Sequence, residues 1–224
     1  MYLSKFLVGV FMLLFVASKA QLKIDSSYMS SYYVHKVTQF KLMPNAPGEI
    51  IFLGDSITDI AEWAELFGNK NIKNRGISTD NTFGVLARLD EVVESKPSKI
   101  LLMIGINDIA KKTPDSFIVQ NIQRIIQYVQ TQSPKTMIII QSILPTNNDF
   151  SEFAGYQNKD EHIRWVNQQI ATYCDTKKVQ FVNLYSLFLD PNNKLSKQYT
   201  SDGLHLNGRG YFLWKQVLLN KKLI

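Results

Sequence analysis

The sequence is poor in the two residue types that most often bind metals or form cross-links. Its 224 residues include one cysteine, Cys174, and three histidines. A single cysteine excludes an intrachain disulfide, and its position among apolar residues predicts a buried packing role. Zinc sites are usually built from several histidine and cysteine ligands. The composition therefore gives no support for a metal centre, and we expect no cofactor.

Basic tracts and long apolar runs are also lacking. The net charge of +6 comes from scattered lysines and arginines, which indicates a solvated surface and no nucleic-acid partner. The apolar run at residues 6–17 is shorter than the ~20 residues that cross a bilayer. With Lys5 before it and the small residues Ser18 and Ala20 after it, the run is typical of a secretory signal peptide cleaved after Ala20. No cysteine stands directly after the apolar run, so a bacterial lipoprotein anchor is not expected. We therefore expect export to the periplasm or medium without a stable membrane anchor.

The rest of the chain has the composition of an ordinary globular protein. Hydrophobic residues make up 45% and charged residues 20%, and the length suits one sizeable core rather than two. We divide the chain into the signal peptide (1–20), a polar lead-in (21–47) and one domain (48–224). His35, in the lead-in, is interpreted as a surface or packing histidine.

Five short apolar runs alternate with helical patterns along this domain. Such alternation predicts a parallel sheet in a three-layer α/β/α sandwich. In the flavodoxin-like strand order 2-1-3-4-5, the first three strands would end on one rim of the sheet. The expected strands are residues 49–53, 72–77, 99–106, 137–140 and 179–184. The expected helices are residues 83–93, 113–129, 163–173 and 211–218, with another opening at Asp59 and with Thr113 as a cap before Pro114.

Three residues predict nucleophilic catalysis. Ser56 follows the first strand at a tight turn that opens a helix, where backbone N–H groups are free. A serine needs a base to take its proton, and His205 is a candidate, with Asp202 three residues before it. Asp202 would accept a hydrogen bond from Nδ1 of His205 and leave Nε2 to face Ser56. His162, among charged residues, is more simply a solvated helix-start residue.

Acyl transfer also needs hydrogen-bond donors for the developing oxyanion. The candidates are the backbone N–H groups of Ser56 and Gly76 and the side-chain amide of Asn107. Taken alone, Gly76 is better explained as a turn glycine and Asn107 as a turn residue or Asx cap, and only the combination of features favours oxyanion donors. Asp55 and Asp108 are interpreted as residues that brace turns.

Four stretches resemble, in order, the four sequence blocks of the SGNH hydrolases, also called the GDSL lipase and esterase family. The resemblance spans residues 49–211, so the domain at 48–224 is expected to be an SGNH-type hydrolase. The family spelling has leucine where Ile57 stands, a variation that leaves the chemistry unchanged. The four stretches are Phe52-Leu53-Gly54-Asp55-Ser56-Ile57-Thr58, Asn74-Arg75-Gly76, Gly105-Ile106-Asn107-Asp108 and Asp202-Gly203-Leu204-His205-Leu206-Asn207-Gly208-Arg209-Gly210-Tyr211.

The resemblance implies a role for each candidate residue. Ser56 would be the nucleophile, His205 the base and Asp202 the carboxylate that orients it. Ser56, Gly76 and Asn107 would supply the oxyanion hole. These roles, and the sandwich fold that the family shares, predict a secreted serine esterase that acts through an acyl-enzyme without a metal or cofactor.

The substrate is less constrained, because the family accepts lipids, thioesters and acetylated sugars. The loop at residues 146–160 is polar and contains Phe150, Phe153 and Tyr156. Aromatic rings among asparagines and aspartates suit stacking on a sugar, so we favour a carbohydrate O-acetylesterase. The same rings would serve equally well to pin the loop down. A lysophospholipase or thioesterase of the same family is the alternative.

Two other classes of protein share parts of the pattern. A non-catalytic receiver or binding module would use Asp108 after the third strand, with Asp55 and Asp59 after the first. It would also need a lysine after the fifth strand, and residues 179–185 contain none. A metal-dependent phosphoesterase could be built on the same three aspartates, but no histidine lies near them in the sequence.

Overall fold

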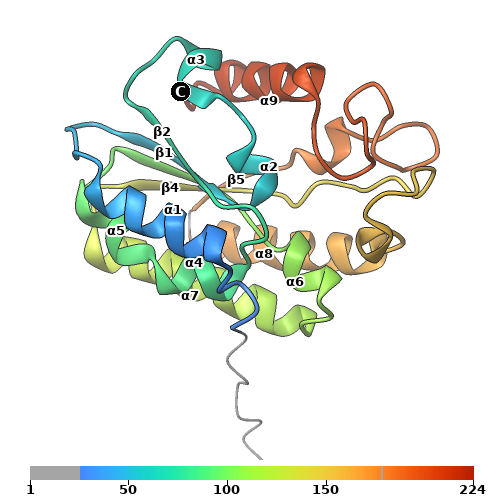
Figure 1. Ribbon diagram of the computed structural model, residues 1–224, viewed down its shortest axis with the longest axis horizontal. Helices are drawn as coiled ribbons and strands as arrows, with labels where there is room; N and C mark the ends of the chain where they lie inside the picture. The colour runs from blue at the N-terminus through green and yellow to red at the C-terminus, as the bar shows by residue number, and fades with distance from the viewer. Residues whose placement is uncertain (1–25, 178) are drawn as a thin grey trace, which may run out of the picture.

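A five-stranded parallel sheet forms the middle layer of the molecule, with helices on both faces (Figure 1). The computed structural model describes residues 26–177 and 179–224. The strand order β2-β1-β3-β4-β5 confirms the predicted topology and the three-layer sandwich. The expected signal peptide, residues 1–20, lies outside the described residues. The strands are β1 (Ile50–Gly54), β2 (Ile72–Gly76), β3 (Lys99–Met103), β4 (Met137–Gln141) and β5 (Gln180–Val182).

The helices α3 and α9 cover one face of the sheet, and α4, α5, α7 and α8 cover the other (Figure 1). Every residue of β1 is buried, as expected for a central strand covered on both faces. Cys174 is fully buried in α8, which confirms its packing role. The helices are α1 (Ser31–Leu42), α2 (Ser56–Asp59), α3 (Trp63–Phe67), α4 (Thr82–Ala87), α5 (Leu89–Glu94), α6 (Ile106–Ala110), α7 (Asp115–Gln132), α8 (Asp160–Lys177) and α9 (Gly208–Asn220), with short 3-10 turns η1 (Ala154–Tyr156) and η2 (Tyr185–Leu187).

An aromatic cluster joins the sheet to α3 and α9. The ring of Phe52 in β1 stacks on Trp63 at a centroid distance of 4.0 Å, and Trp214 packs edge-on against Trp63 at 4.8 Å. The hydroxyl of Tyr211 donates a hydrogen bond to the carbonyl oxygen of Ile57 (2.8 Å). Because Ile57 belongs to α2, this bond ties the C-terminal helix to the turn that follows β1.

Several predicted element boundaries are wrong, each for a local reason. The helix expected to open at Asp59 begins at Ser56 and ends at Asp59, before α3 starts at Trp63. The third strand ends at Met103, since Gly105 has a φ of 131° and α6 follows directly. Thr113 is not the cap of α7, which begins at Asp115 after Pro114.

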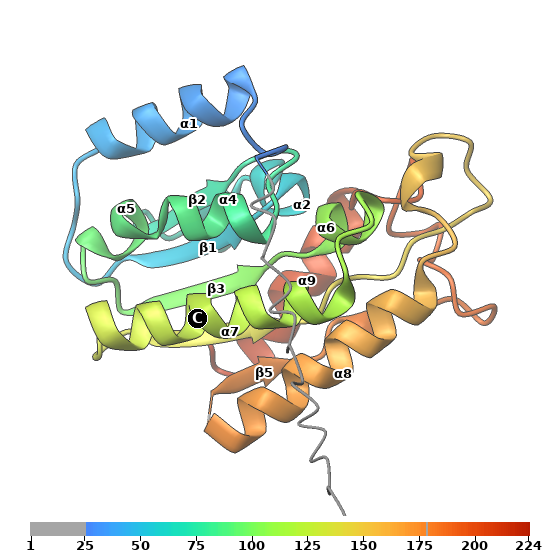
Figure 2. The same cartoon turned by 90° about the horizontal axis from the view of Figure 1, so that it is seen from below.

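One predicted helix is interrupted and another was missed. The helix expected at residues 83–93 is divided into α4 and α5 at Arg88, whose buried guanidinium turns inward. The lead-in contains α1, for which the sequence pattern gave no prediction. Figure 2 shows α1 at the β2 end of the sheet. Its buried side chains are Tyr33 and Phe40, while His35 is exposed, so it is the surface rather than the packing histidine of the two expected alternatives. No helix in the described parts of the chain is both long and apolar enough to span a membrane.

Candidate active site

The turn after β1 presents Ser56 at the first position of α2. Asp55 caps this helix by accepting a hydrogen bond from the Ile57 N–H (3.0 Å), which confirms its predicted role in bracing the turn. Ser56 itself is partly exposed. Its N–H makes no hydrogen bond to any described residue, as is usual for the first turn of a helix. The turn therefore offers a hydroxyl and a free backbone donor side by side.

The structure brings the three predicted catalytic residues into one line. Ser56 Oγ lies 2.9 Å from Nε2 of His205, and Nδ1 of His205 lies 2.7 Å from Oδ2 of Asp202. The N–H groups of Leu204 and His205 each donate to Oδ1 of Asp202 at 2.8 Å. Burial alone would raise the pKa of Asp202, but these hydrogen bonds and the His205 ring hold it below its usual range. An ionised carboxylate is thus available to orient the ring and stabilise its charged form.

The amide of Asn107, at the start of α6, is held in a defined orientation. Its Nδ2 donates to the carbonyl oxygen of Asp80 (2.8 Å), and its Oδ1 accepts from the Tyr156 hydroxyl (2.8 Å). A carbonyl oxygen can only accept, so the first bond determines which end of the amide is nitrogen. The second N–H of the amide has no hydrogen-bond partner among the described residues and is available as a donor. The sequence pointed to Asn107 but did not reveal that Tyr156 holds it.

Gly76 is not placed as expected. Its N–H donates to Oδ1 of Asn74 (2.8 Å), so it is not free for an oxyanion. The same Asn74 side chain donates through Nδ2 to the Thr58, Asp59 and Ala61 carbonyl oxygens. A Cβ at position 76 would lie 2.2 Å from the Asp59 nitrogen. The glycine is therefore required because β2 and α2 approach closely, and Asn74, two residues earlier, was the signal that its N–H would be engaged.

The turn at residues 77–80, just after β2, contains a donor that the sequence did not indicate. The Asp80 N–H bonds to the Ile77 carbonyl oxygen (3.0 Å), and the Ser78 N–H bonds to the Asp59 carboxylate (3.1 Å). Between them, Thr79 has a left-handed φ of 69°, which is strained for a β-branched residue. Its N–H has no hydrogen-bond partner in the described part of the protein.

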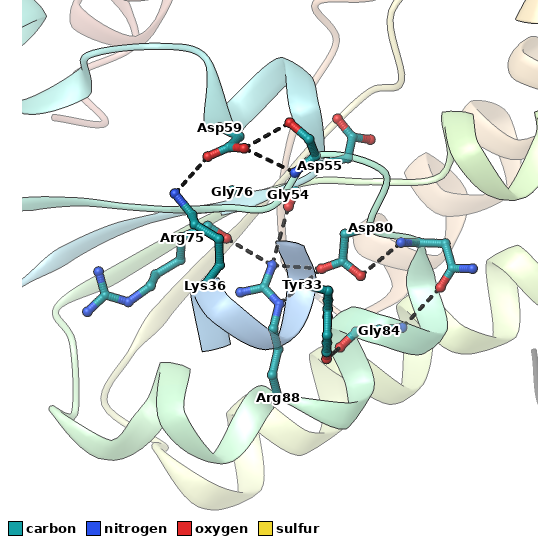
Figure 3. A network of polar contacts seen from close by, with 12 residues as sticks. Tyr33, Lys36, Gly54, Asp55, Asp59, Arg75, Gly76, Asp80, Gly84 and Arg88 are labelled. Atoms are coloured by element: carbon teal, nitrogen blue, oxygen red, sulfur yellow. Dashed lines mark hydrogen bonds and ion pairs between the residues drawn. The ribbon is translucent and has the colours of Figure 1, made fainter. Parts of the chain in front are cut away.

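A buried polar network supports these loops from below (Figure 3). The Arg88 guanidinium pairs with Asp80 at 2.9 Å and donates to the Arg75 and Gly54 carbonyl oxygens at 2.9 and 3.3 Å. Burial raises the pKa of Asp80 to about 6, although Arg88 opposes the shift. One guanidinium thus joins the ends of β1 and β2 to the turn that holds Asn107.

Two further buried acids lie close to this network. Asp108 accepts hydrogen bonds from the Thr82 N–H and from Thr82 Oγ1 (2.6 Å) and is fully buried, which confirms its bracing role. Burial raises the pKa of Asp55 and of Asp108 to about 7, with a contribution from the nearby Asp80 charge. An enclosed, hydrogen-bonded Asp108 offers no accessible oxygen to a phosphoryl donor. The receiver interpretation therefore loses its acceptor residue.

The structure also argues against a metal-dependent phosphoesterase, because the three aspartates that would bind the metal are each engaged elsewhere. Asp55 caps α2, Asp108 binds Thr82, and Asp59 binds Lys36 (2.9 Å), so the three carboxylates serve separate partners. Within the described residues, no group of three or more histidine, cysteine, aspartate or glutamate side chains is arranged to hold a metal ion.

The aromatic residues of loop 146–160 divide into two roles. Phe150 lies against Gly203, so it pins the loop to the segment that carries Asp202. The Phe153 ring stands edge-on to the His205 ring, with centroids 4.9 Å apart, and remains 43% exposed. One partly exposed aromatic ring therefore lies directly beside His205, which contacts Ser56.

Known proteins share both the sequence pattern and the fold. The chain is 28% identical over 170 residues to Platelet-activating factor acetylhydrolase IB subunit alpha2 of Rattus norvegicus, covering 73% of this chain and 71% of that protein. A structure from Streptococcus pneumonia, provisionally described as a platelet activating factor, matches with a TM-score of 0.78 and 33% identity over 85% of this chain and 92% of that one. A catalytic mutant of an acetylxylan esterase from Geobacillus stearothermophilus shares the fold, with a TM-score of 0.62 and 17% identity over 79% of this chain and 94% of that one. Residues 52–213 match the model of the GDSL-like Lipase/Acylhydrolase family, and the chain belongs to this family.

Proposed function

We propose that the protein is an exported serine esterase that removes acetyl groups from carbohydrates. The esterase activity is proposed from a chain of two hydrogen bonds. Ser56 Oγ lies 2.9 Å from His205 Nε2, and His205 Nδ1 lies 2.7 Å from Asp202 Oδ2. This arrangement supports nucleophilic catalysis of ester cleavage.

The reaction follows from the positions of these groups. Ser56 Oγ attacks the ester carbonyl carbon while His205 Nε2 takes its proton, and the Asp202 carboxylate stabilises the imidazolium. The Ser56 N–H and the free N–H of Asn107 bind the oxyanion. We propose the Thr79 N–H, which has no hydrogen-bond partner among the described residues, as the third donor in place of Gly76, whose N–H is bound by Asn74. His205 then protonates the leaving alcohol, and water, deprotonated by His205, releases the acid from Ser56.

The carbohydrate part rests on the surroundings of the catalytic pair. Phe153 offers a ring for stacking beside His205, and a polar cleft of ≈ 330 Å³ lies at the base of the same loop. Thr146, in this cleft, donates to the Tyr156 carbonyl oxygen (3.4 Å), which connects the cleft to the residue that holds Asn107. The names of the compared acetylhydrolase and acetylxylan esterase both refer to acetyl groups. The cleft is lined by Thr146, Asn148, Asn158, Asp160, Glu161, Arg164, Asn192, Asn193 and Lys194.

The test compares acetylated xylo-oligosaccharides with p-nitrophenyl acetate and p-nitrophenyl octanoate. We expect turnover of the acetyl substrates, and Ser56→Ala should abolish it while leaving the melting temperature within a few degrees of wild type. Phe153→Ala should raise KM for the oligosaccharide by roughly 2- to 12-fold, as expected for the loss of one aromatic stacking contact of about 0.5–1.5 kcal/mol, without changing KM for p-nitrophenyl acetate. A fully active Ser56→Ala protein would refute the mechanism. An unchanged oligosaccharide KM in Phe153→Ala would refute the stacking role.

A second candidate substrate is favoured by a different surface. An apolar groove of ≈ 530 Å³ runs between α3 and the start of α9 and is lined in part by Ile60, Leu66, Leu206 and Tyr211. Two of these lining residues are close in sequence to the proposed catalytic residues, since Leu206 follows His205 and Ile60 lies four residues after Ser56. The groove suits an aliphatic chain, as in a lysophospholipid or an acyl thioester. Faster hydrolysis of the octanoyl than of the acetyl ester would favour this substrate over an acetylated sugar.

Export is proposed from the N-terminal sequence alone. The pattern at residues 1–20 supports cleavage after Ala20. Expression of the full chain in a bacterial host should give a periplasmic or secreted protein whose intact mass corresponds to a chain beginning at Gln21. Retention of the whole N-terminus in the cytosolic fraction would contradict this proposal.

A further inference from the structure

Asp59, the last residue of α2, is a meeting point of three segments. Its side chain is only 7% exposed, and it accepts from Lys36 Nζ (2.9 Å), the Tyr32 hydroxyl (2.8 Å) and both the N–H and Oγ of Ser78 (3.1 and 2.8 Å). Figure 3 shows Lys36 reaching this carboxylate. Burial would raise the pKa of Asp59, but the Lys36, Tyr32 and Ser78 hydrogen bonds lower it below its usual range. The carboxylate is therefore ionised and saturated with donors.

Two of these donors come from α1, which precedes the region matched by the family model. The helix is anchored by other residues at two separate points. The Tyr33 hydroxyl donates to the Gly84 carbonyl oxygen (2.8 Å), and the Phe40 ring lies under the Arg75 guanidinium, with its centroid 4.6 Å from Cζ. Lys36 and Tyr32 are therefore not the only residues that anchor α1, and their contacts with Asp59 add a direct link from this helix to α2 and the turn at residues 77–80.

The contacts form a continuous path from α1 to the proposed oxyanion hole. Asp59 lies three residues after Ser56 in the same short helix and binds Ser78 on the neighbouring turn. That turn continues through Thr79 to Asp80, whose carbonyl oxygen holds the Asn107 amide (2.8 Å). The Asp59 carboxylate, which α1 holds through Lys36 and Tyr32, therefore links α2, the helix that carries Ser56, to the turn at residues 77–80. This turn contains the proposed donor Thr79 and the Asp80 carbonyl oxygen that orients Asn107.

We propose that Lys36 and Tyr32 are positioning residues for catalysis, which act through Asp59 and Ser78 on the turn at residues 77–80. This inference rests on the catalytic role of Ser56 proposed above, and it does not depend on the identity of the alcohol. Through these two residues, α1 contributes to the positioning of the site. Because the path ends at oxyanion donors, its loss affects the transition state more than substrate binding.

The test measures kcat and KM for p-nitrophenyl acetate in the full chain. Lys36→Met keeps the alkyl chain and removes the charge, and we expect kcat to fall roughly 5- to 20-fold with KM within about twofold of wild type. Lys36→Arg, which restores a donor, should recover most of kcat. The control is Lys41→Met, which changes an exposed lysine of the same helix and should leave both constants unchanged. Tyr32→Phe, which deletes one exposed hydroxyl, provides a milder variant if Lys36→Met folds poorly.

Two readouts separate positioning from general stability. If the path is real, Ser78→Ala and Lys36→Met will be non-additive in kcat, because both act through Asp59. Amide exchange at Ser78 should also accelerate in Lys36→Met, and this measurement does not require turnover, so it remains informative if the esterase proposal fails. A lower melting temperature with unchanged kcat, additive losses of kcat, or unchanged Ser78 exchange would each overturn the inference.

Discussion

Replacing Tyr156 by phenylalanine tests whether the orientation of the Asn107 amide matters for turnover. In the structure this amide is held by two hydrogen bonds of 2.8 Å, one from the Tyr156 hydroxyl and one to the Asp80 carbonyl oxygen. Tyr156→Phe removes the first and leaves the second. A hydrogen bond of this kind contributes about 0.5–1.5 kcal/mol, so we expect kcat to fall roughly 3- to 10-fold.

The size of this loss is bounded by the effect of removing the amide itself. Asn107→Ala deletes one oxyanion donor, for which a loss of roughly 10²- to 10³-fold in kcat is expected. If Tyr156 acts only by holding Asn107, adding Tyr156→Phe to Asn107→Ala will cause no further loss. Initial rates on p-nitrophenyl acetate over a range of concentrations give kcat and KM for all four proteins.

Two results would refute this reasoning. An unchanged kcat in Tyr156→Phe would mean that the Asp80 carbonyl oxygen alone is sufficient to orient the amide. Independent, additive losses in the double variant would mean that the hydroxyl contacts the substrate rather than Asn107.

Three further changes test the packing and the electrostatics around the site. Gly76→Ala should lower the free energy of unfolding, measured by urea denaturation, by at least about 2 kcal/mol, because the new Cβ would lie 2.2 Å from the backbone of α2. Gly155→Ala, which has open space around the new atom, is the control and should be neutral. Equal effects of the two substitutions would contradict the packing role of Gly76. Thr79→Gly should retain activity and raise the melting temperature slightly, since glycine relieves a left-handed φ of 69°, and a lower melting temperature would argue against strain. Burial raises the pKa of Asp108 to about 7, so the wild-type protein should lose stability relative to Asp108→Asn as the pH rises from about 4 to about 7. The loss is at most on the order of 4 kcal/mol. If the urea midpoints of the two proteins differ by the same amount at pH 5 and at pH 7.5, this prediction is wrong.

The sequence was sufficient to predict the sheet and the contacts among Ser56, His205 and Asp202, because both depend on repeated or localised signals. Continuous apolar runs marked the strands, and the alternation with helices limited the strand order to a few choices. Asp202 and His205 are close in sequence, so their contact was inferable. Ser56 could be joined to them only through the topology and the family resemblance.

The features that were missed depend on single side-chain contacts. Gly76 was expected to donate to an oxyanion, but the Asn74 side chain binds its N–H. The break between α4 and α5 follows from Arg88, a charged residue that is buried because it pairs with Asp80. Charged residues are normally predicted at the surface. The α1 helix buries only Tyr33 and Phe40, too few residues to give a periodic apolar signal.

The two halves of the catalytic pair are far apart in the order of synthesis. His205 follows Ser56 by 149 residues, so a growing chain contains its serine long before its base. A serine without a base is a weak nucleophile at neutral pH, and contacts between such distant residues carry a high loop-closure cost during folding. Under the proposed mechanism, ester cleavage would begin only after the C-terminal part of the domain has been made and folded against β1. Recovery of turnover during refolding then reports the final assembly of the molecule.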